Sequence, residues 1–436
     1  MAGKNGVGAA WKKVRGRAMV IAAVGALWMA PAAVRATDYN WAINASGLFD
    51  TTANWDPGGP PDTLSDSASF SQTGTYTVTF QSNKTNSFAD IRNGNVTFAL
   101  SGLTYTSALE VGFADGQTAR LTLSNGTVSA TSVEIANTPA DTGFLTVSSN
   151  AVLNASGTFL VGSGGAGTLT VQNGGDITTA GFSTIGSFST ALGAATVSGS
   201  GSTWTSNGQL FIGNSGSGSL SITGGGQVTA TAVGTTFIGV SAGAEGSLSV
   251  SGTGSRFSAT VGALNAGSAG KGSIAISAGG EVTAPAVNLG SSTGSSGLIT
   301  ISGADSTLAT SGALTIGSSG SGTVNLTSGG LLTSLSGSMA SSIGSVGTVS
   351  IDGAGSAWNI TNGLTVGGGG TGTITISNGG AIAAGSNTTL GNLSGSSGAL
   401  TVTGAASSFT ASTIVVGFNG TGSLNILDGG IVNALP

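Results

Sequence analysis

Hydrophobic and polar residues alternate along most of this chain, in short runs with a period of two. The clearest runs have the form Gly-x-apolar-x-apolar, as in the five residues that begin at Gly167. Such alternation is typical of a β-strand with one buried and one exposed face. We therefore expect Leu169 and Val171 to point into a core, and Thr168 and Thr170 to point outward.

The same run recurs thirteen times, at intervals of 24 to 28 residues. It begins at Ala119, Gly143, Gly167, Gly193, Gly218, Gly246, Gly272, Gly297, Gly322, Gly347, Gly372, Gly398 and Gly422. A second marker, an apolar residue followed by Gly, comes late in most repeats, as at Ile212-Gly213 and Ile316-Gly317. A fixed period of this length indicates stacked coils that bury a continuous core. The sequence predicts an all-β fold, a right-handed parallel β-helix (β-solenoid) with about 25 residues and three short strands per coil.

The turn after each run comes in two forms that alternate along the chain. In the shorter form an apolar residue follows six positions after the second core residue, at Ile177, Val228, Val282, Leu332, Ile382 and Val432. In the longer form it follows after seven, at Trp204, Phe257, Leu308, Trp358 and Phe409. The large rings occur only in the longer form, so we expect Trp204 and Trp358 to fill the core. The true period is two coils, with Gly and Asn closing the turns.

Four regions are expected along the chain. Residues 1–36 have a basic start, a short apolar stretch and small residues up to Ala36, which predicts a signal peptide; a membrane anchor is the alternative. Residues 37–75 hold Trp41, Trp55 and several prolines and are expected to cap the first coil, with a sugar-binding aromatic patch as the alternative. Residues 76–118 are expected to form irregular first coils, and residues 119–436 the solenoid repeats.

The amino-acid composition excludes several kinds of catalytic and binding site. Charged residues make up 6% of the chain, and Cys and His are absent, which excludes disulfides, an imidazole base and a Ser–His–Asp triad. Beyond residue 36 the chain has five basic and 16 acidic residues, a net charge of −11. Nucleic acid is therefore not an expected partner. The Gly-rich turns lack the Lys of a phosphate-binding loop, and the two lysines beyond residue 36, Lys84 and Lys271, lie in no recognisable motif.

Four acidic residues are the best candidates for a site. Glu110 and Glu134 each precede the late core residue of a coil and should stack on adjacent coils, with Asp115 and Asp141 in the turns that follow. Two carboxylates at strand spacing could share a proton or bind a hard cation such as calcium. The alternative is a solvated pair without a catalytic or metal role, and we predict no catalytic residue and no cofactor. Asp62 and Asp66 are expected to be turn residues of the cap.

The alternating turns and the apolar-Gly marker resemble a repeat family found in passengers of type V autotransporters and in PEP-CTERM surface proteins of Gram-negative bacteria. The matching stretches run from Gly167 to Gly181 and from Gly193 to Gly213, and the likeness covers residues 119–436. The resemblance implies an extended passenger with an adhesive role. A membrane barrel or a sorting tail of those families would have to follow Pro436 or be supplied by a partner.

The expected function is an exported structural or adhesive surface scaffold, secreted or held at the cell surface, and not an enzyme. Its expected partners are surface glycans or other cells, and no membrane span is expected in the mature chain. Two alternatives stay open. A polysaccharide lyase or hydrolase on the same scaffold would use clustered carboxylates. A calcium-dependent glycan-binding module would use the same acidic residues as ligands.

Overall fold

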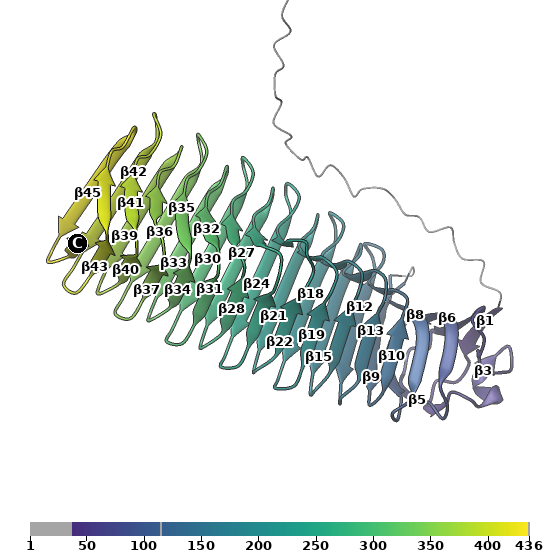
Figure 1. The fold of residues 1–436 in the computed structure, drawn as a ribbon. Coiled ribbons are helices and arrows are strands. Elements are labelled where there is room, and N and C mark those ends of the chain that lie inside the picture. Colours follow the sequence, from purple (N-terminus) through teal and green to yellow (C-terminus); the bar gives the residue numbers. More distant parts are fainter. Residues whose placement is uncertain (1–36, 114–115, 435–436) are drawn as a thin grey trace, which may run out of the picture. The chain divides into compact units, whose positions relative to one another are not determined.

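The computed structural model describes residues 37–113 and 116–434, so the expected signal peptide and Asp115 lie outside the described residues. The described residues form a parallel β-solenoid in which strands stack coil upon coil (Figure 1). This confirms the all-β, parallel β-helix that the sequence predicts. The helical element among these residues is η1 (Thr52–Asn54), and no helix in this part of the chain is long and apolar enough to cross a bilayer.

Each coil of the solenoid is called a rung. The first strands of the rungs form one 16-stranded parallel sheet. Its thirteen regular members pair every repeat start with the next, for example Gly218 with Gly246. The strands are β2 (Gly47–Leu48), β5 (Thr75–Thr79), β7 (Gly94–Ala99), β9 (Thr118–Ser124), β12 (Thr142–Ser148), β15 (Ala166–Gln172), β18 (Leu192–Ser198), β21 (Ser217–Thr223), β24 (Glu245–Ser251), β27 (Lys271–Ser277), β30 (Ser296–Ser302), β33 (Ser321–Thr327), β36 (Val346–Asp352), β39 (Thr371–Ser377), β42 (Ser397–Thr403) and β45 (Thr421–Leu427).

Second strands form another parallel ladder, which carries the alternating core positions. It contains β10 (Thr127–Ala130), β13 (Val152–Ala155), β16 (Asp176–Thr179), β19 (Thr203–Ser206), β22 (Gln227–Ala230), β25 (Arg256–Ala259), β28 (Glu281–Ala284), β31 (Thr307–Thr310), β34 (Leu331–Ser334), β37 (Ala357–Ile360), β40 (Ala381–Ala384), β43 (Ser408–Ala411) and β46 (Ile431–Ala434).

Third strands form the last ladder. It contains β11 (Val133–Ile135), β14 (Phe159–Val161), β17 (Ser183–Ile185), β20 (Leu210–Ile212), β23 (Thr236–Ile238), β26 (Leu264–Ala266), β29 (Val287–Leu289), β32 (Ala313–Ile316), β35 (Ser336–Met339), β38 (Leu364–Val366), β41 (Asn387–Leu390) and β44 (Thr413–Val416).

The first coils depart from three strands per rung. There one long strand takes the place of the second and third strands, in β6 (Lys84–Ile91) and β8 (Thr104–Val111). β8 pairs with β10 through its first half and with β11 through its second half, so the two ladders merge into one 30-stranded sheet. The physical reason is local: residues 104–111 contain no Gly, Asn or Pro that would turn the chain.

The residues before the repeats contain an antiparallel pair. β1 (Thr37–Trp41) pairs with β3 (Trp55–Asp56) antiparallel and with β4 (Asp66–Phe70) parallel. Trp41 and Trp55 are buried, with ring centroids 5.1 Å apart and nearly perpendicular planes. Their burial removes the exposed ring faces that a sugar-binding aromatic patch would need. Further rings of the first coils, among them Phe49, Phe70 and Tyr76, pack onto this pair.

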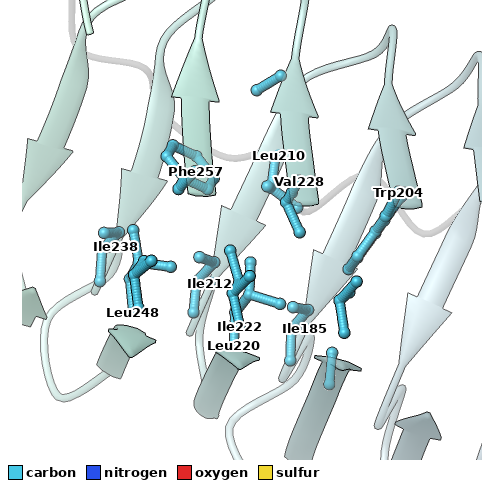
Figure 2. Close-up of a cluster of buried hydrophobic side chains, with 14 of the residues drawn as sticks. Ile185, Trp204, Leu210, Ile212, Leu220, Ile222, Val228, Ile238, Leu248 and Phe257 are labelled. Carbon is cyan, nitrogen blue, oxygen red and sulfur yellow. The ribbon is translucent and has the colours of Figure 1, made fainter. Parts of the chain in front are cut away.

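Aliphatic side chains of successive rungs line up in the core (Figure 2). Leu220 and Ile222 are buried and register with Leu248 and Val250 of the next rung, as the alternation predicts. In the second-strand ladder, Trp204 lies between Ile177 and Val228. The same order continues at Phe257, Trp358 and Phe409, each placed between smaller aliphatic residues of shorter-turn rungs, whereas Leu308 lies between Val282 and the equally large Leu332. Trp204 and Trp358 are both 0% exposed.

The two glycine markers of the repeat contact each other at the corner between the third strand of one rung and the first strand of the next. A Cβ on Gly218, which starts a repeat, would lie 2.2 Å from the backbone nitrogen of Gly213, the Gly of the apolar-Gly marker. A Cβ on Gly213 would in turn lie 2.2 Å from the carbonyl oxygen of Glu245 in the next rung. Both positions therefore need glycine because backbone of one rung lies directly against backbone of the next.

Candidate functional site

The predicted carboxylates Glu110 and Glu134 do stack. They are register partners on β8 and β11 and project from the outer face, while the flanking residues of their strands are buried. Sequence reasoning missed a third member: Asp90 on β6 is the register partner of Glu110. The repeat pattern could not reveal it, because the first coils lack the markers that align the later ones. Three carboxylates thus occupy one position on three adjacent rungs.

These carboxylates lie in different surroundings. Asp90 is 0% exposed and forms an ion pair with Arg92, two residues further along the chain. Burial raises the pKa of Glu134 above its usual range, and the neighbouring Ser163 hydroxyl acts in the opposite direction. Burial disfavours the charged form of a carboxyl group, so the neutral form of Glu134 is favoured relative to that of an exposed Glu.

Asp141 lies outside this column, in the turn where the sequence places it. Its carboxylate accepts hydrogen bonds from the backbone N–H of Gly116 at 3.1 Å and of Thr138 at 2.8 Å, and from the Thr138 hydroxyl at 2.9 Å. The side chain is buried and holds together two turns of adjacent rungs. The other turn candidate, Asp115, lies outside the described residues.

Acidic residues elsewhere show no metal-binding arrangement in the described part of the chain. No group of three or more Asp and Glu residues there is placed to hold a metal ion. Asp66 has the turn role that the sequence predicts, since its carboxylate accepts the backbone N–H of Asp62 and of Thr63. The predicted absence of a metal site stays a prediction.

Further along the third-strand ladder, the outward residue in the middle of β20, β23, β26 and β29 is aromatic or an amide instead of acidic. Phe211 and Phe237 register with each other and stack with centroids 5.7 Å apart and planes 4° from parallel. The next two rungs carry Asn265 and Asn288, whose side-chain amides are joined by a hydrogen bond of 2.7 Å. Phe182, 55% exposed, contacts Phe211. Cross-rung pairs of like side chains of this kind stabilise the ladder itself.

The first-strand ladder presents the most uniform outer face. The third position after each repeat start points outward on thirteen consecutive rungs and carries a hydroxyl or amide on all but one. These residues are Thr122, Thr146, Thr170, Thr196, Ser221, Ser249, Ala275, Thr300, Asn325, Ser350, Thr375, Thr401 and Asn425. The neighbouring outward column is less regular, since Thr168 registers with Phe144 and Ala194. The Ser/Thr/Asn column is uncharged and hydrogen-bonding, but the two columns together are not the regular Thr lattice of an ice-binding surface.

Comparisons with known proteins add little beyond the fold. No family model matches the chain, and no curated protein matches it. One solved structure does, the TibC-catalyzed hyper-glycosylated fragment of TibA, with 19% sequence identity and a TM-score of 0.38. The match covers 91% of this chain and 99% of that fragment. Because this similarity is low, the solenoid fold is assigned from the strand registers of this chain and not from that match.

Proposed function

We propose that this chain is an exported structural and adhesive surface scaffold of a Gram-negative bacterium, with a role like that of an autotransporter passenger. The observation that carries the proposal is the outward column that carries Ser, Thr or Asn on twelve of thirteen consecutive rungs. A repeated uncharged face of this kind offers many weak, identical contacts, and identical contacts held on one rigid body add up to strong attachment.

The arrangement of the repeats supports the same proposal. The thirteen regular rungs follow one another without an inserted loop, since the longest repeat is 28 residues. Active sites on such scaffolds are usually built on longer loops. The acidic column at Asp90, Glu110 and Glu134 lies on strands, at the start of the stack, and Asp90 is already paired with Arg92. These features favour a scaffold over a polysaccharide-degrading enzyme.

Adhesion can be tested with the purified chain lacking residues 1–36. Fluorescent beads coated with it should be retained on bacterial and epithelial cells more than beads coated with a carrier protein of similar net charge. Equal retention would contradict the adhesive role. Release of reducing or unsaturated ends from a polysaccharide panel, lost in Glu134→Gln, would replace the scaffold proposal with an enzyme.

Export needs its own experiment. Residues 1–40 fused to a periplasmic reporter enzyme should give activity outside the inner membrane and a mature form cleaved near Ala36. An uncleaved fusion that stays in the membrane would favour the alternative of an N-terminal anchor.

A further inference from the structure

A shallow groove of about 680 Å³ crosses six rungs on the outer face of the first-strand ladder. It follows the stacking direction from β15 to β30, over roughly 24 Å at the spacing of parallel strands. One side is lined by the residue before each repeat start, from Ala166 to Ser296, and the other by the residue after it, from Thr168 to Leu298. The repeat-start glycines lie between them and form the floor.

Small side chains create this groove, and larger ones limit it. The side that begins at Thr168 continues with the small residues Ala194, Ser219, Ser247 and Ser273, and the backbone of the inward-facing glycines forms the floor between the two sides. One rung before the groove, the ring of Phe144 lies under the guanidinium of Arg120, 3.6 Å from the ring centroid. At the other end the column changes to Leu298 and then to β-branched residues, beginning with Thr323. The groove is therefore a bounded feature of these rungs and not a general property of the repeat.

The groove cannot take a partner strand by backbone pairing. The residues of its floor already pair with both neighbouring rungs, as Gly218 does with Gly193 and Gly246. An occupant must therefore bind through side-chain hydroxyls and the exposed apolar surface. This argues against an extended peptide, whose usual mode of binding to a sheet is the addition of a strand at an edge.

Charge points to a neutral occupant. The two charged residues of the lining, Glu245 and Lys271, lie on adjacent rungs and neutralise each other in an ion pair of 3.0 Å. The remaining side chains of the two sides are hydroxyls in the middle, such as Ser219 and Ser247, with Leu192 and Leu298 toward the ends. A polyanion or polycation finds no opposite net charge here. A ligand with many hydroxyls and apolar C–H faces matches both kinds of lining.

We propose that this groove binds an uncharged polysaccharide chain that lies along the stacking direction. Its hydroxyls exchange hydrogen bonds with Thr168, Ser219, Ser247 and Ser273, and its C–H faces lie against the glycine floor. The proposal rests on the proposed function, in that it supplies one specific ligand for a scaffold that adheres to surfaces.

The test uses the chain lacking residues 1–36 and an array of uncharged oligosaccharides of six or more sugars, covering glucans, galactans, mannans and xylans, with alginate and polygalacturonate as acidic comparators. Ser247→Arg places a long charged side chain in the groove without disturbing the core. Thr348→Arg is the matched control, because Thr348 occupies the same outward column two rungs beyond the groove. Circular dichroism and melting temperature report whether each variant folds.

The expected result is binding of one or more uncharged oligosaccharides, weakened at least about tenfold by Ser247→Arg and unchanged by Thr348→Arg. Binding to no uncharged oligosaccharide, equal binding by folded Ser247→Arg, or binding to the acidic polymers alone would overturn the groove assignment. Bead adhesion separates the two proposals: wild-type adhesion without oligosaccharide binding leaves the scaffold function in place and removes the groove. If Ser247→Arg does not fold, Ser219→Arg provides the same comparison from the adjacent groove rung.

Discussion

Ser356 accepts a hydrogen bond of 3.0 Å from the backbone N–H of Gly329 in the preceding rung. Ser356 lies in a longer turn and Gly329 in a shorter one, so the bond joins the two alternating turn forms. The same bond recurs in every longer turn from β18 to β43, with Ser202, Ser255, Ser306 and Ser407 as the acceptors. Each of these serines is buried.

Removing this acceptor should loosen two rungs together. Ser356→Ala removes the hydrogen-bond partner of the Gly329 N–H in a half-buried turn, which should cost about 0.5–1.5 kcal/mol. Hydrogen exchange should show the Gly329 amide losing protection, since rungs of a repeat protein open locally. Ser350→Ala, on the outer face of the same rung, should leave that amide protected. Unchanged exchange at Gly329 in Ser356→Ala would refute the role of the bond.

The contact between the two glycine columns predicts a steric effect. Gly218→Ala would place a methyl group 2.2 Å from the backbone nitrogen of Gly213, so the rungs must separate. We expect a loss of about 1–3 kcal/mol or more in urea unfolding, as for other overpacked sites. Ser219→Ala, one residue further on and pointing outward, is the control. Equal stability of the two variants would mean that the backbone can shift at no cost.

The alternating core column predicts that a large residue is needed at each longer turn. Trp358 is buried between Leu332 and Ile382, and its indole N–H donates to the Ser334 hydroxyl at 3.0 Å. Trp358→Ala should cost about 3–5 kcal/mol, measured by denaturation followed through hydrogen exchange of the three rungs. Asn359→Ala, at the adjacent outward position, should cost much less. A small loss for Trp358→Ala would show that the neighbouring rungs can close the cavity.

The raised pKa of Glu134 predicts a pH dependence of stability. At a pH below the pKa that Glu134 has in the unfolded chain, its carboxyl is protonated in both states and burial carries no penalty. As the pH rises through the pKa of Glu134 in the folded chain, the folded state loses stability relative to the unfolded state. Glu134→Gln should therefore be more stable than wild type at pH 7–8 and should lose that advantage at acid pH. Glu110 on β8, Leu160 on β14 and Ser163 are the neighbours that face this group.

Asp352 provides a comparison of opposite sign. Hydrogen bonds from Ser377 and then Asn378 lower the pKa of Asp352, so its contribution is present above the unfolded pKa and is lost as pH falls through the folded pKa. Asp352→Asn should weaken the fold at neutral pH and not at strongly acid pH. Melting temperatures of Glu134→Gln, Asp352→Asn and wild type, measured from pH 3 to 8, test both predictions. If the melting temperatures of Glu134→Gln and wild type change in parallel with pH, the raised pKa of Glu134 is contradicted.

Most of the solenoid could be predicted because its signals repeat. Period-two alternation gave the inward residues, such as Leu220 and Ile222, and the spacing of glycines gave the rung boundaries. Glu110 and Glu134 could be aligned because each precedes a core residue. Asp90 could not be aligned with them, because the register of β6 shifts between Thr85 and Phe88 and no repeat marker in the sequence indicates this shift. The groove was missed because it depends on several neighbouring rungs having small residues at once.

The alternation of turn forms also restricts how the chain can change in length. A longer-turn rung contacts shorter-turn rungs through both its serine and its large core residue. Loss or gain of a single rung would place two bulky layers, or two thin ones, against each other. Among the alternating rungs, from β15 to β45, insertions and deletions that preserve packing must therefore come in pairs of rungs, so natural variants should differ in length there by steps of roughly 10 Å along the stack.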